Sequence, residues 1–407
     1  MSFDVRRVRA AYPALGDGYA YLDGAAGTQV PGRVIDAIAG TYRGGLSNTG
    51  GAFPASQRSG EVEAACRQAV ADLTGGTADG VILGPNMTTL TYRLAATLAK
   101  DWAEGDEIVV SRLDHDANIR PWIQAAQRCG AVVRWAEADL ATGELPAGQY
   151  QELIGERTRL VAVTAASNVL GTRPGVAAIT AMARAAGALS YVDGVHATAH
   201  GPVDIARLGA DFYATSAYKW SGPHIGAVIA DPGLLASLRP DKLAPQEDVV
   251  PSRFERGTLP FADLAGVTAA VDHLAGLDDQ AGGTRRERLL ASMAAAEQHE
   301  LRLFQVLIDG LASMSHVTLY GKAQRRTATA YFTVDGVSPR QVAERLAERR
   351  INVWDGDNYA WEVTGALGIR DSGSAVRAGL VHYNDASDVD RLLAAVAGLD
   401  DRRLAGS

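Results

Sequence analysis

The first candidate for chemistry in this chain is a lysine, because lysine occurs only four times in its 407 residues. Lys219 stands in SAYKWSGPHIG (216–226), among Ser, Tyr, Trp, Gly and Pro and between two apolar segments. A lysine on a surface turn normally has polar neighbours, and a buried lysine normally has a partner or a task. We therefore interpret Lys219 as a functional amine, with a surface turn lysine as the alternative.

Two further groups complement this amine. The segment GPNMTT (84–89) follows a predicted strand and opens a predicted helix, and the N–H groups at such a helix start bind phosphate. Simple capping of the helix by Asn86 is the alternative. Asp193 follows another predicted strand. An amine, a carboxylate and a phosphate site together suit pyridoxal 5′-phosphate, which needs a lysine for its Schiff base, a carboxylate that keeps its pyridine nitrogen protonated, and donors for its phosphate.

These groups follow predicted strands of a parallel sheet. Short β-branched runs alternate with longer segments of helical periodicity, which is typical of βαβ units with helices on both faces of the sheet. Ligands of such sheets bind beyond the carboxyl ends of the strands. The predicted strands are 80–84, 107–111, 131–137, 159–165, 188–193, 211–217 and 225–230.

The pattern changes after about residue 265, where a long helical stretch leads into a smaller α+β region. Its predicted strands are 317–321, 327–334, 351–356 and 375–383, and its later helices are 339–348 and 386–398. We predict a large cofactor-binding domain over 15–265, and a small domain formed by 1–14 and 266–407 that completes the active site. No flexible linker is visible between them, so we expect an extensive interface.

The composition argues against several classes of function and partner. The chain has 39 basic and 47 acidic residues, a formal net charge of −8, and no basic block, so no nucleic-acid partner is expected. No apolar run reaches the roughly 18 residues of a membrane span. Two cysteines cannot form a disulfide framework, and no signal peptide is visible, so a cytoplasmic location is expected. No metal site is predicted.

The chain resembles the class V aminotransferase family of fold-type I pyridoxal-phosphate enzymes, and within it the cysteine desulfurase-like branch. The resemblance covers nearly the whole chain. It implies an α/β enzyme with a mostly parallel mixed sheet in the large domain, a smaller α+β C-terminal domain, and a homodimer with shared active sites. It is carried by YLDGAAGTQVP (21–31), RLDHDANIRPW (112–122), AASNVLGT (165–172), VDGVHATAHGPVD (192–204), SAYKWSGPHIG (216–226), FERGT (254–258) and VRAGLVHYN (376–384).

The resemblance implies roles around the cofactor. Lys219 would form the Schiff base, and Asp193 would pair with the pyridinium nitrogen. His115 would stack on the ring; it matches the His of the family's E-H-x-A element, although Asp114 replaces the Glu. His196 falls where relatives often have a Gln that reaches the phenolic oxygen.

Further roles concern the phosphate and the substrate. Ser216 would hold the phosphate together with the backbone of Asn86, Met87 and Thr88, and Thr258 would reach the phosphate of the neighbouring subunit. The substrate carboxylate would be bound by Asn168 and Arg377.

The chain departs from the desulfurases at one loop, VWDGDNYAWE (353–362). Tyr359 stands where their nucleophilic cysteine is expected, and Cys66 and Cys129 are interpreted as structural. Without a thiolate nucleophile, sulfur transfer through a persulfide is not expected. Tyr359 is either a proton donor or an aromatic wall of the substrate pocket, and Trp354 with Tyr359 suggests room for a bulky substituent.

The predicted function is therefore a C–S β-lyase that releases thiol, pyruvate and ammonia from an S-substituted cysteine, with Lys219 as the base that removes the Cα proton. Enzymes of this branch work in natural-product biosynthesis, including ergothioneine and lincosamide assembly, and one type performs decarboxylation-coupled oxidative deamination of an S-conjugated cysteine. That reaction is the main alternative. An aminotransferase, an epimerase and a non-catalytic cofactor-binding scaffold are the others.

Overall fold

Seven strands form the sheet of the larger lobe in the computed structural model, which describes residues 3–399. Their order is β2-β8-β7-β6-β5-β3-β4. β8 runs antiparallel to both of its neighbours, and the other pairs are parallel. The strands are β2 (Val81–Gly84), β3 (Glu107–Ser111), β4 (Val132–Ala136), β5 (Thr158–Thr164), β6 (Leu189–Asp193), β7 (Phe212–Ser216) and β8 (Gly226–Ala230).

Both faces of this sheet are buried, since successive side chains of a strand point to opposite faces. In β3, Ile108 and Val110 pack into one apolar core, and Val109 between them packs into the other. The first core is covered by α4 (Met87–Leu98) and α5 (Arg120–Cys129). The second is covered by α3 (Pro54–Thr74), α7 (Val176–Ala185), α10 (Phe261–Leu274) and α11 (Arg285–Ala312). The predicted α/β fold with a mostly parallel mixed sheet is confirmed.

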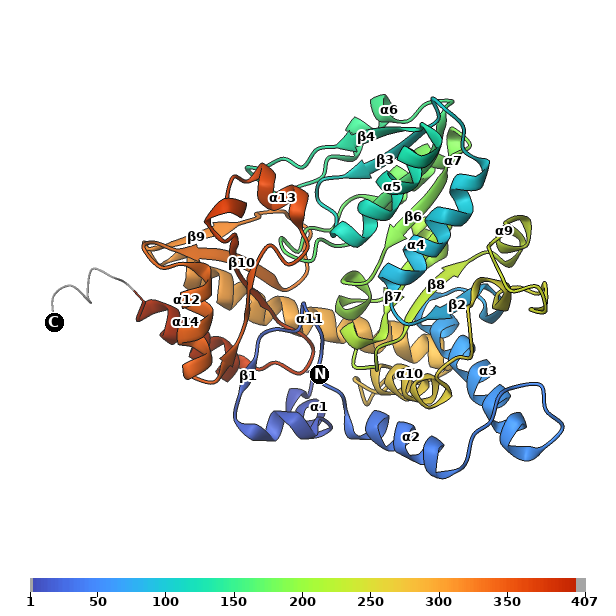
Figure 1. Ribbon diagram of the computed structural model, residues 1–407. Coiled ribbons are helices and arrows are strands. Elements are labelled where there is room, and N and C mark those ends of the chain that lie inside the picture. Colours follow the sequence, from blue (N-terminus) through green and yellow to red (C-terminus); the bar gives the residue numbers. More distant parts are fainter. Residues whose placement is uncertain (1–2, 400–407) are drawn as a thin grey trace.

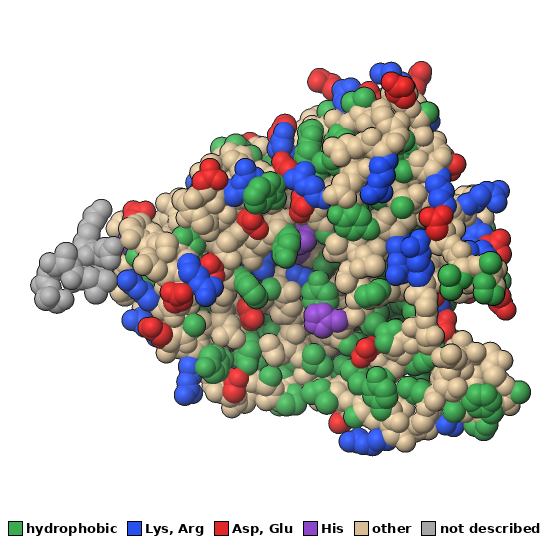
Figure 2. Space-filling model, in the orientation of Figure 1, with side chains coloured by type: hydrophobic (Ala, Val, Ile, Leu, Met, Phe, Trp, Pro, Cys, Tyr) green, Lys and Arg blue, Asp and Glu red, His purple; other side chains and the backbone are tan. Residues whose placement is uncertain are grey.

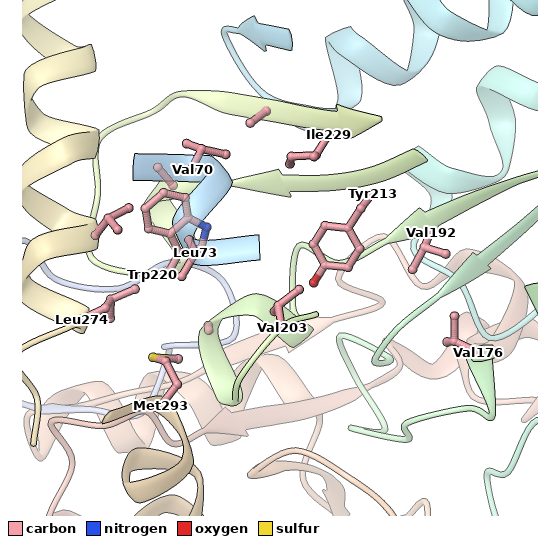
Figure 3. Close-up of a cluster of buried hydrophobic side chains, with 14 of the residues drawn as sticks. Val70, Leu73, Val176, Val192, Val203, Tyr213, Trp220, Ile229, Leu274 and Met293 are labelled. Atoms are coloured by element: carbon pink, nitrogen blue, oxygen red, sulfur yellow. The ribbon is translucent and has the colours of Figure 1, made fainter. Parts of the chain in front are cut away.

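Trp220, next in sequence to Lys219, is buried in this second core. Figure 3 shows its indole among Val70 and Leu73 of α3, Leu274 of α10 and Met293 of α11. The indole N–H donates to the hydroxyl of Thr215 at 2.9 Å. The turn after β7 is therefore anchored in the core of the large lobe.

The smaller lobe is built on a four-stranded antiparallel sheet in the order β12-β13-β10-β9. Figure 1 shows α12 and α14 beside it, and α11 running from the large lobe to the small one. Its elements are β9 (Val317–Tyr320), β10 (Thr329–Val334), α12 (Pro339–Glu348), β12 (Trp354–Gly356), α13 (Trp361–Ala366), β13 (Ala375–Gly379) and α14 (Ala386–Ala397).

Helix α11 belongs to both lobes. A capping box of Thr284 and Glu287 fixes its start. Its first half places Met293 in the core of the large lobe, and its second half places Leu307 in the core of the small lobe. The two lobes are therefore joined by a continuous helix, while the extent of their interface and the domain boundary near residue 265, which falls inside α10, stay predictions.

Two predicted strands differ from the structure. The segment 351–356 splits into β11 (Ile351–Asn352), which pairs with β1 (Ala20–Tyr21), and β12, which joins the four-stranded sheet. The segment 375–383 leaves the sheet after Gly379, because Asn384 accepts the N–H of Val381 and closes a turn. Helices α1 (Val5–Ala10) and α2 (Gly32–Arg43) were not predicted.

Charged side chains of both signs occur on the surface of the molecule. Basic and acidic side chains are interspersed over the face in Figure 2. In residues 3–399, no helix is both long enough and apolar enough to cross a membrane.

Candidate active site

Lys219 ends the short turn between β7 and β8, and its side chain is buried. Its Nζ donates to the carbonyl oxygen of Ala25 at 2.5 Å. Burial and the positive charge of Arg377 lower the pKa of this amine to about 7, and Asp193 opposes the shift. A buried amine that loses its proton near neutral pH suits both imine formation and proton abstraction.

Asp193 ends β6, the strand beside β7, and its carboxylate is also buried. The N–H of Val195 donates to its Oδ1 at 2.9 Å. Burial raises the pKa of Asp193 to about 6, while that hydrogen bond and Lys219 oppose the rise. The carboxylate is thus mostly ionised at neutral pH, as a partner of a pyridinium N–H must be.

The start of α4 forms a cradle of donors beside Lys219. Asn86 caps the helix by accepting the N–H of Thr89 at 2.8 Å, and the N–H of Met87 donates to the Ser216 hydroxyl at 3.0 Å. β8 passes so close that a Cβ at Gly226 would lie 2.5 Å from the Met87 nitrogen. Because the N–H groups of Met87 and Thr89 already have these partners, the Thr88 N–H and the Ser216 hydroxyl are the donors within residues 3–399 that this cradle leaves for a phosphate.

His115 follows β3 and faces the same pocket. Its Nδ1 accepts the N–H of Ala117 at 3.0 Å. Burial, with the charges of Lys219 and Arg377, lowers the pKa of this imidazole to about 3. His115 is therefore a neutral ring whose Nε2 carries the proton. The adjacent Asp114 is buried and hydrogen-bonded to Ser111 and Asn118, and burial raises its pKa to about 8.

Arg377 lies on β13 and enters the site from the small lobe. It is buried, and its Nη1 donates to the carbonyl oxygen of Asn168 at 3.1 Å. Burial lowers the pKa of its guanidinium to about 10, so the charge persists at neutral pH. No other hydrogen bond from this guanidinium reaches a described residue, which leaves donors for a carboxylate. The side-chain N–H of Asn168 donates to the carbonyl oxygen of Asn358.

These side chains surround one pocket that is open to solvent. The structure brings most of the predicted site residues to its walls: Met87, Thr88, His115, Asn168, Asp193, His196, Ser216 and Lys219. Arg377 contacts those walls through its hydrogen bond to Asn168, and Asn86 directly precedes Met87. Within the described residues, no group of three or more His, Cys, Asp and Glu side chains could hold a metal ion.

Three residues that the sequence predicted for the site do not line this pocket. Tyr359 is 70% exposed, and its ring stacks on His115 with centroids 5.3 Å apart. Trp354 is 50% exposed and is the cross-strand neighbour of Arg377. Thr258 is exposed and away from this pocket, so any role it has at a phosphate requires a second subunit.

The structure adds residues that sequence reasoning did not identify. Tyr218 lines the pocket and stacks on His224, and its position next to Lys219 was a usable signal. Thr327 and Thr329 of the small lobe hydrogen-bond to His196, and nothing in the sequence pattern links them. Thr164 and Val195 complete the walls next to Asp193.

The loop that carries Tyr359 is attached to the large lobe beside His115. The carboxylate of Glu362 on α13 binds Arg112 at 2.8 Å and also binds Arg120. The N–H of Asp116 donates to the carbonyl oxygen of Tyr359 at 2.7 Å. Glu362 thus bridges two arginines that flank His115 in sequence.

We expect Glu362→Gln to raise the KM about fivefold, because loss of a half-buried ion pair costs on the order of 1 kcal/mol and loosens this loop. Glu344→Gln on α12 removes an exposed ion pair and serves as the matched control. Steady-state kinetics at low and high salt measure the effect. A KM that matches that of the control would show that the bridge does not position the loop.

The chain is similar to proteins of one family. The family described as Aminotransferase class-V matches residues 20–392. The chain is 40% identical to "Uncharacterized protein MT3887" of Mycobacterium tuberculosis, covering 98% of this chain and 100% of that protein. It is 35% identical to a probable cysteine desulfurase of Pseudomonas aeruginosa, covering 95% of this chain and 96% of that protein. The solved cysteine desulfurase CsdA of Escherichia coli matches with a TM-score of 0.84 and 29% identity, covering 100% of this chain and 99% of that one.

Proposed function

Because this chain belongs to the class-V aminotransferases and is a pyridoxal-phosphate enzyme, we propose that it is a C–S β-lyase acting on an S-substituted cysteine. The cofactor supplies an electron sink for the carbanion formed at the substrate Cα. The residues of the pocket fit it through a buried amine, a buried carboxylate and a helix start that offers N–H donors.

The observation that carries this proposal is that neither of the two cysteines lies in the pocket. Cys66 is fully buried in α3, and burial raises its thiol pKa to about 12. Cys129 ends α5, where its Sγ lies within hydrogen-bond distance of the Ala125 carbonyl oxygen. The residue stacked on His115 is Tyr359. Desulfuration through a persulfide needs a thiolate nucleophile, whereas β-elimination needs none.

In this proposal the Lys219 amine would hold the cofactor and would then act as the base for the Cα proton of the substrate. The pKa of about 7 keeps a substantial fraction of this amine neutral at physiological pH. Asp193, ionised above about pH 6, would accept the N–H of the cofactor's pyridine ring. His115, a neutral imidazole, would pack on that ring. Thr258, exposed in one subunit, would contact the phosphate in the other subunit of a homodimer.

Arg377 and Asn168 bind the α-carboxylate of the substrate. A guanidinium binds a carboxylate through two parallel hydrogen bonds, which fixes the orientation of the Cα–H bond. Trp354 is the cross-strand neighbour of Arg377, and Tyr359 covers His115. These exposed aromatic side chains favour a bulky or aromatic S-substituent over free cysteine.

The reaction is balanced without an oxidant. The Cα proton passes to Lys219, the electron pair of the broken C–H bond expels the sulfur as a thiolate, and 2-aminoacrylate is released. Water converts 2-aminoacrylate to pyruvate and ammonia. The net change consumes one water, because the C–S bond is broken by elimination and only the C–N bond is hydrolysed.

The test is incubation of the cofactor-loaded enzyme with S-methyl-, S-benzyl- and S-aryl-cysteines, followed by mass spectrometry of the products. Equal amounts of thiol and pyruvate would support the lyase. CO2 with an S-linked aldehyde and no pyruvate would overturn it in favour of decarboxylating oxidative deamination. Alanine with enzyme-bound sulfur from free cysteine would instead show a desulfurase.

We expect Tyr359→Phe to retain full turnover, because phenylalanine keeps the ring that stacks on His115, and the Tyr359 hydroxyl makes no hydrogen bond to any described residue. Tyr359→Ala is expected to raise the KM about tenfold for S-benzylcysteine and less for S-methylcysteine, since an aromatic contact contributes about 0.5–1.5 kcal/mol. Parallel kinetics on the two substrates measure this. A large loss of kcat in Tyr359→Phe would assign the hydroxyl a role in proton transfer.

A further inference from the structure

We infer that Thr327 and Thr329 of the small lobe fix the tautomer of His196, so that this histidine presents an N–H to the phenolic oxygen of the cofactor. This goes beyond the proposed reaction and rests only on the cofactor placement proposed above. The two threonines are positioning residues, because they act through His196.

The geometry around His196 separates its two ring nitrogens. Nε2 lies 3.0 Å from the hydroxyl of Thr327 and 3.0 Å from that of Thr329, and both hydroxyls are buried. Nδ1 makes no hydrogen bond to any residue in the described part of the chain. His196 lines the pocket that contains Lys219 and Asp193. One nitrogen is therefore occupied by the small lobe, and the other is left for a ligand.

His196 stays neutral, so its single ring proton must lie on one nitrogen or the other. Burial lowers its pKa well below the usual value, and the nearby cationic groups Lys219, Arg377 and Arg173 lower it further. His200 has the same effect; its ring centroid is 4.5 Å from that of His196, and it is paired with the buried Glu300 at 2.6 Å. No carboxylate hydrogen-bonds to His196 itself within residues 3–399.

The hydroxyls allow Nε2 to be the acceptor. Thr327 lies within reach of the carbonyl oxygen of Gly171 at 3.4 Å and can donate its proton there. Thr329 then has its own proton free to donate to Nε2, with the Thr327 hydroxyl 3.2 Å away as its only other side-chain partner. A carbonyl at this place would have forced the proton onto Nε2.

The tautomer of His196 decides whether an N–H or a lone pair on Nδ1 faces the phenolic oxygen of the cofactor. With the proton on Nδ1, His196 donates a charge-assisted hydrogen bond to the phenolate, which competes with the imine proton for that oxygen. With the proton on Nε2, a lone pair would face the phenolate, and the two would repel. The hydroxyls of the small lobe thus lower the pH at which the Schiff base loses its proton.

The test is a pH titration of the visible absorption of the loaded enzyme in Thr329→Val, which has nearly the same shape and no hydroxyl. Thr329→Ser keeps the hydroxyl and is the matched control. We expect the midpoint of Thr329→Val to rise by about one pH unit, the size expected from weakening one charge-assisted hydrogen bond. Thr329→Ser should titrate like the parent enzyme.

A midpoint of Thr329→Val that equals that of Thr329→Ser, or that falls, would overturn the inference. A second measurement is made on the parent enzyme labelled with 15N-histidine, and it uses His196→Gln only to assign the signals. The nitrogen shifts of His196 must show a proton on Nδ1, and a proton on Nε2 would refute the proposal. Neither experiment uses substrate, so neither result depends on whether the enzyme cleaves a C–S bond. The proposed cofactor placement is tested separately by the loss of the visible absorption band in Lys219→Ala.

Discussion

Lys219→Ala is expected to lose both the visible absorption band of the lysine-bound cofactor and about 10³-fold or more of the turnover, since a positioned general base alone contributes about 10²–10⁴-fold. Among the four lysines, only Lys219 lines the pocket. The other lysines, Lys100, Lys242 and Lys322, do not line the pocket, and the nitrogen of Lys100 binds Asp241 at 2.6 Å. Absorption spectra and product assays of the purified variant measure both losses.

The matched control is Lys100→Ala, which removes an exposed lysine and should keep the band and the activity. The pH dependence of loading adds a second check in the native protein. Imine formation needs the neutral amine, and the pKa of Lys219 is lowered to about 7. The rate at which the apoprotein takes up the cofactor should therefore rise with pH through about 7 and then level off. A rise centred near 10, the pKa of a free lysine, would contradict this account of the site.

Arg377→Gln is expected to raise the KM about 100-fold, because two charge-assisted hydrogen bonds to the substrate carboxylate are lost at about 1.5–3 kcal/mol each. Arg377→Lys keeps the charge without the fork, and about a tenfold rise is expected. Steady-state kinetics on one S-substituted cysteine measure both variants. Unchanged KM values would place the carboxylate elsewhere.

The same two variants distinguish the role of Arg377 in substrate binding from the effect of its charge on the pKa of Lys219. The guanidinium of Arg377 helps to lower the pKa of Lys219. Without that charge the pKa rises, and the pH midpoint of kcat should move upward in Arg377→Gln. It should stay in place in Arg377→Lys. Because the Asn168 carbonyl loses a donor in Arg377→Gln, a melting temperature for each variant is needed to exclude unfolding.

The sequence allowed the core of the site to be predicted for a geometric reason. Parallel strands end at the same edge of a sheet, so the residues at the ends of β2, β6 and β7 had to converge, and Thr88, Asp193 and Lys219 line one pocket. The direction of β8 was not predictable, since a buried strand has the same apolar composition whichever way it runs. Its antiparallel course brings Gly226 against the start of α4.

The contributions of the small lobe were harder to predict. The role of Arg377 came from the resemblance, and the structure places this residue on β13 beside Trp354. Thr329 lies on the strand paired with β13, but only tertiary packing brings its hydroxyl to His196, far away in sequence. The bridge of Glu362 to Arg112 and Arg120 likewise depends on how the two lobes meet. Periodicity and turn chemistry carry no information about such contacts.

Helix α11 limits which parts of this chain can be replaced separately, in evolution or by protein engineering. Its 28 residues contribute side chains to the cores of both lobes. A continuous helix that is shared in this way couples the free energies of the two lobes, because unwinding it in one core exposes apolar surface in the other. The lobes are therefore not exchangeable modules, and a chimera with a foreign small lobe would have to exchange α11 together with the surfaces on which it packs.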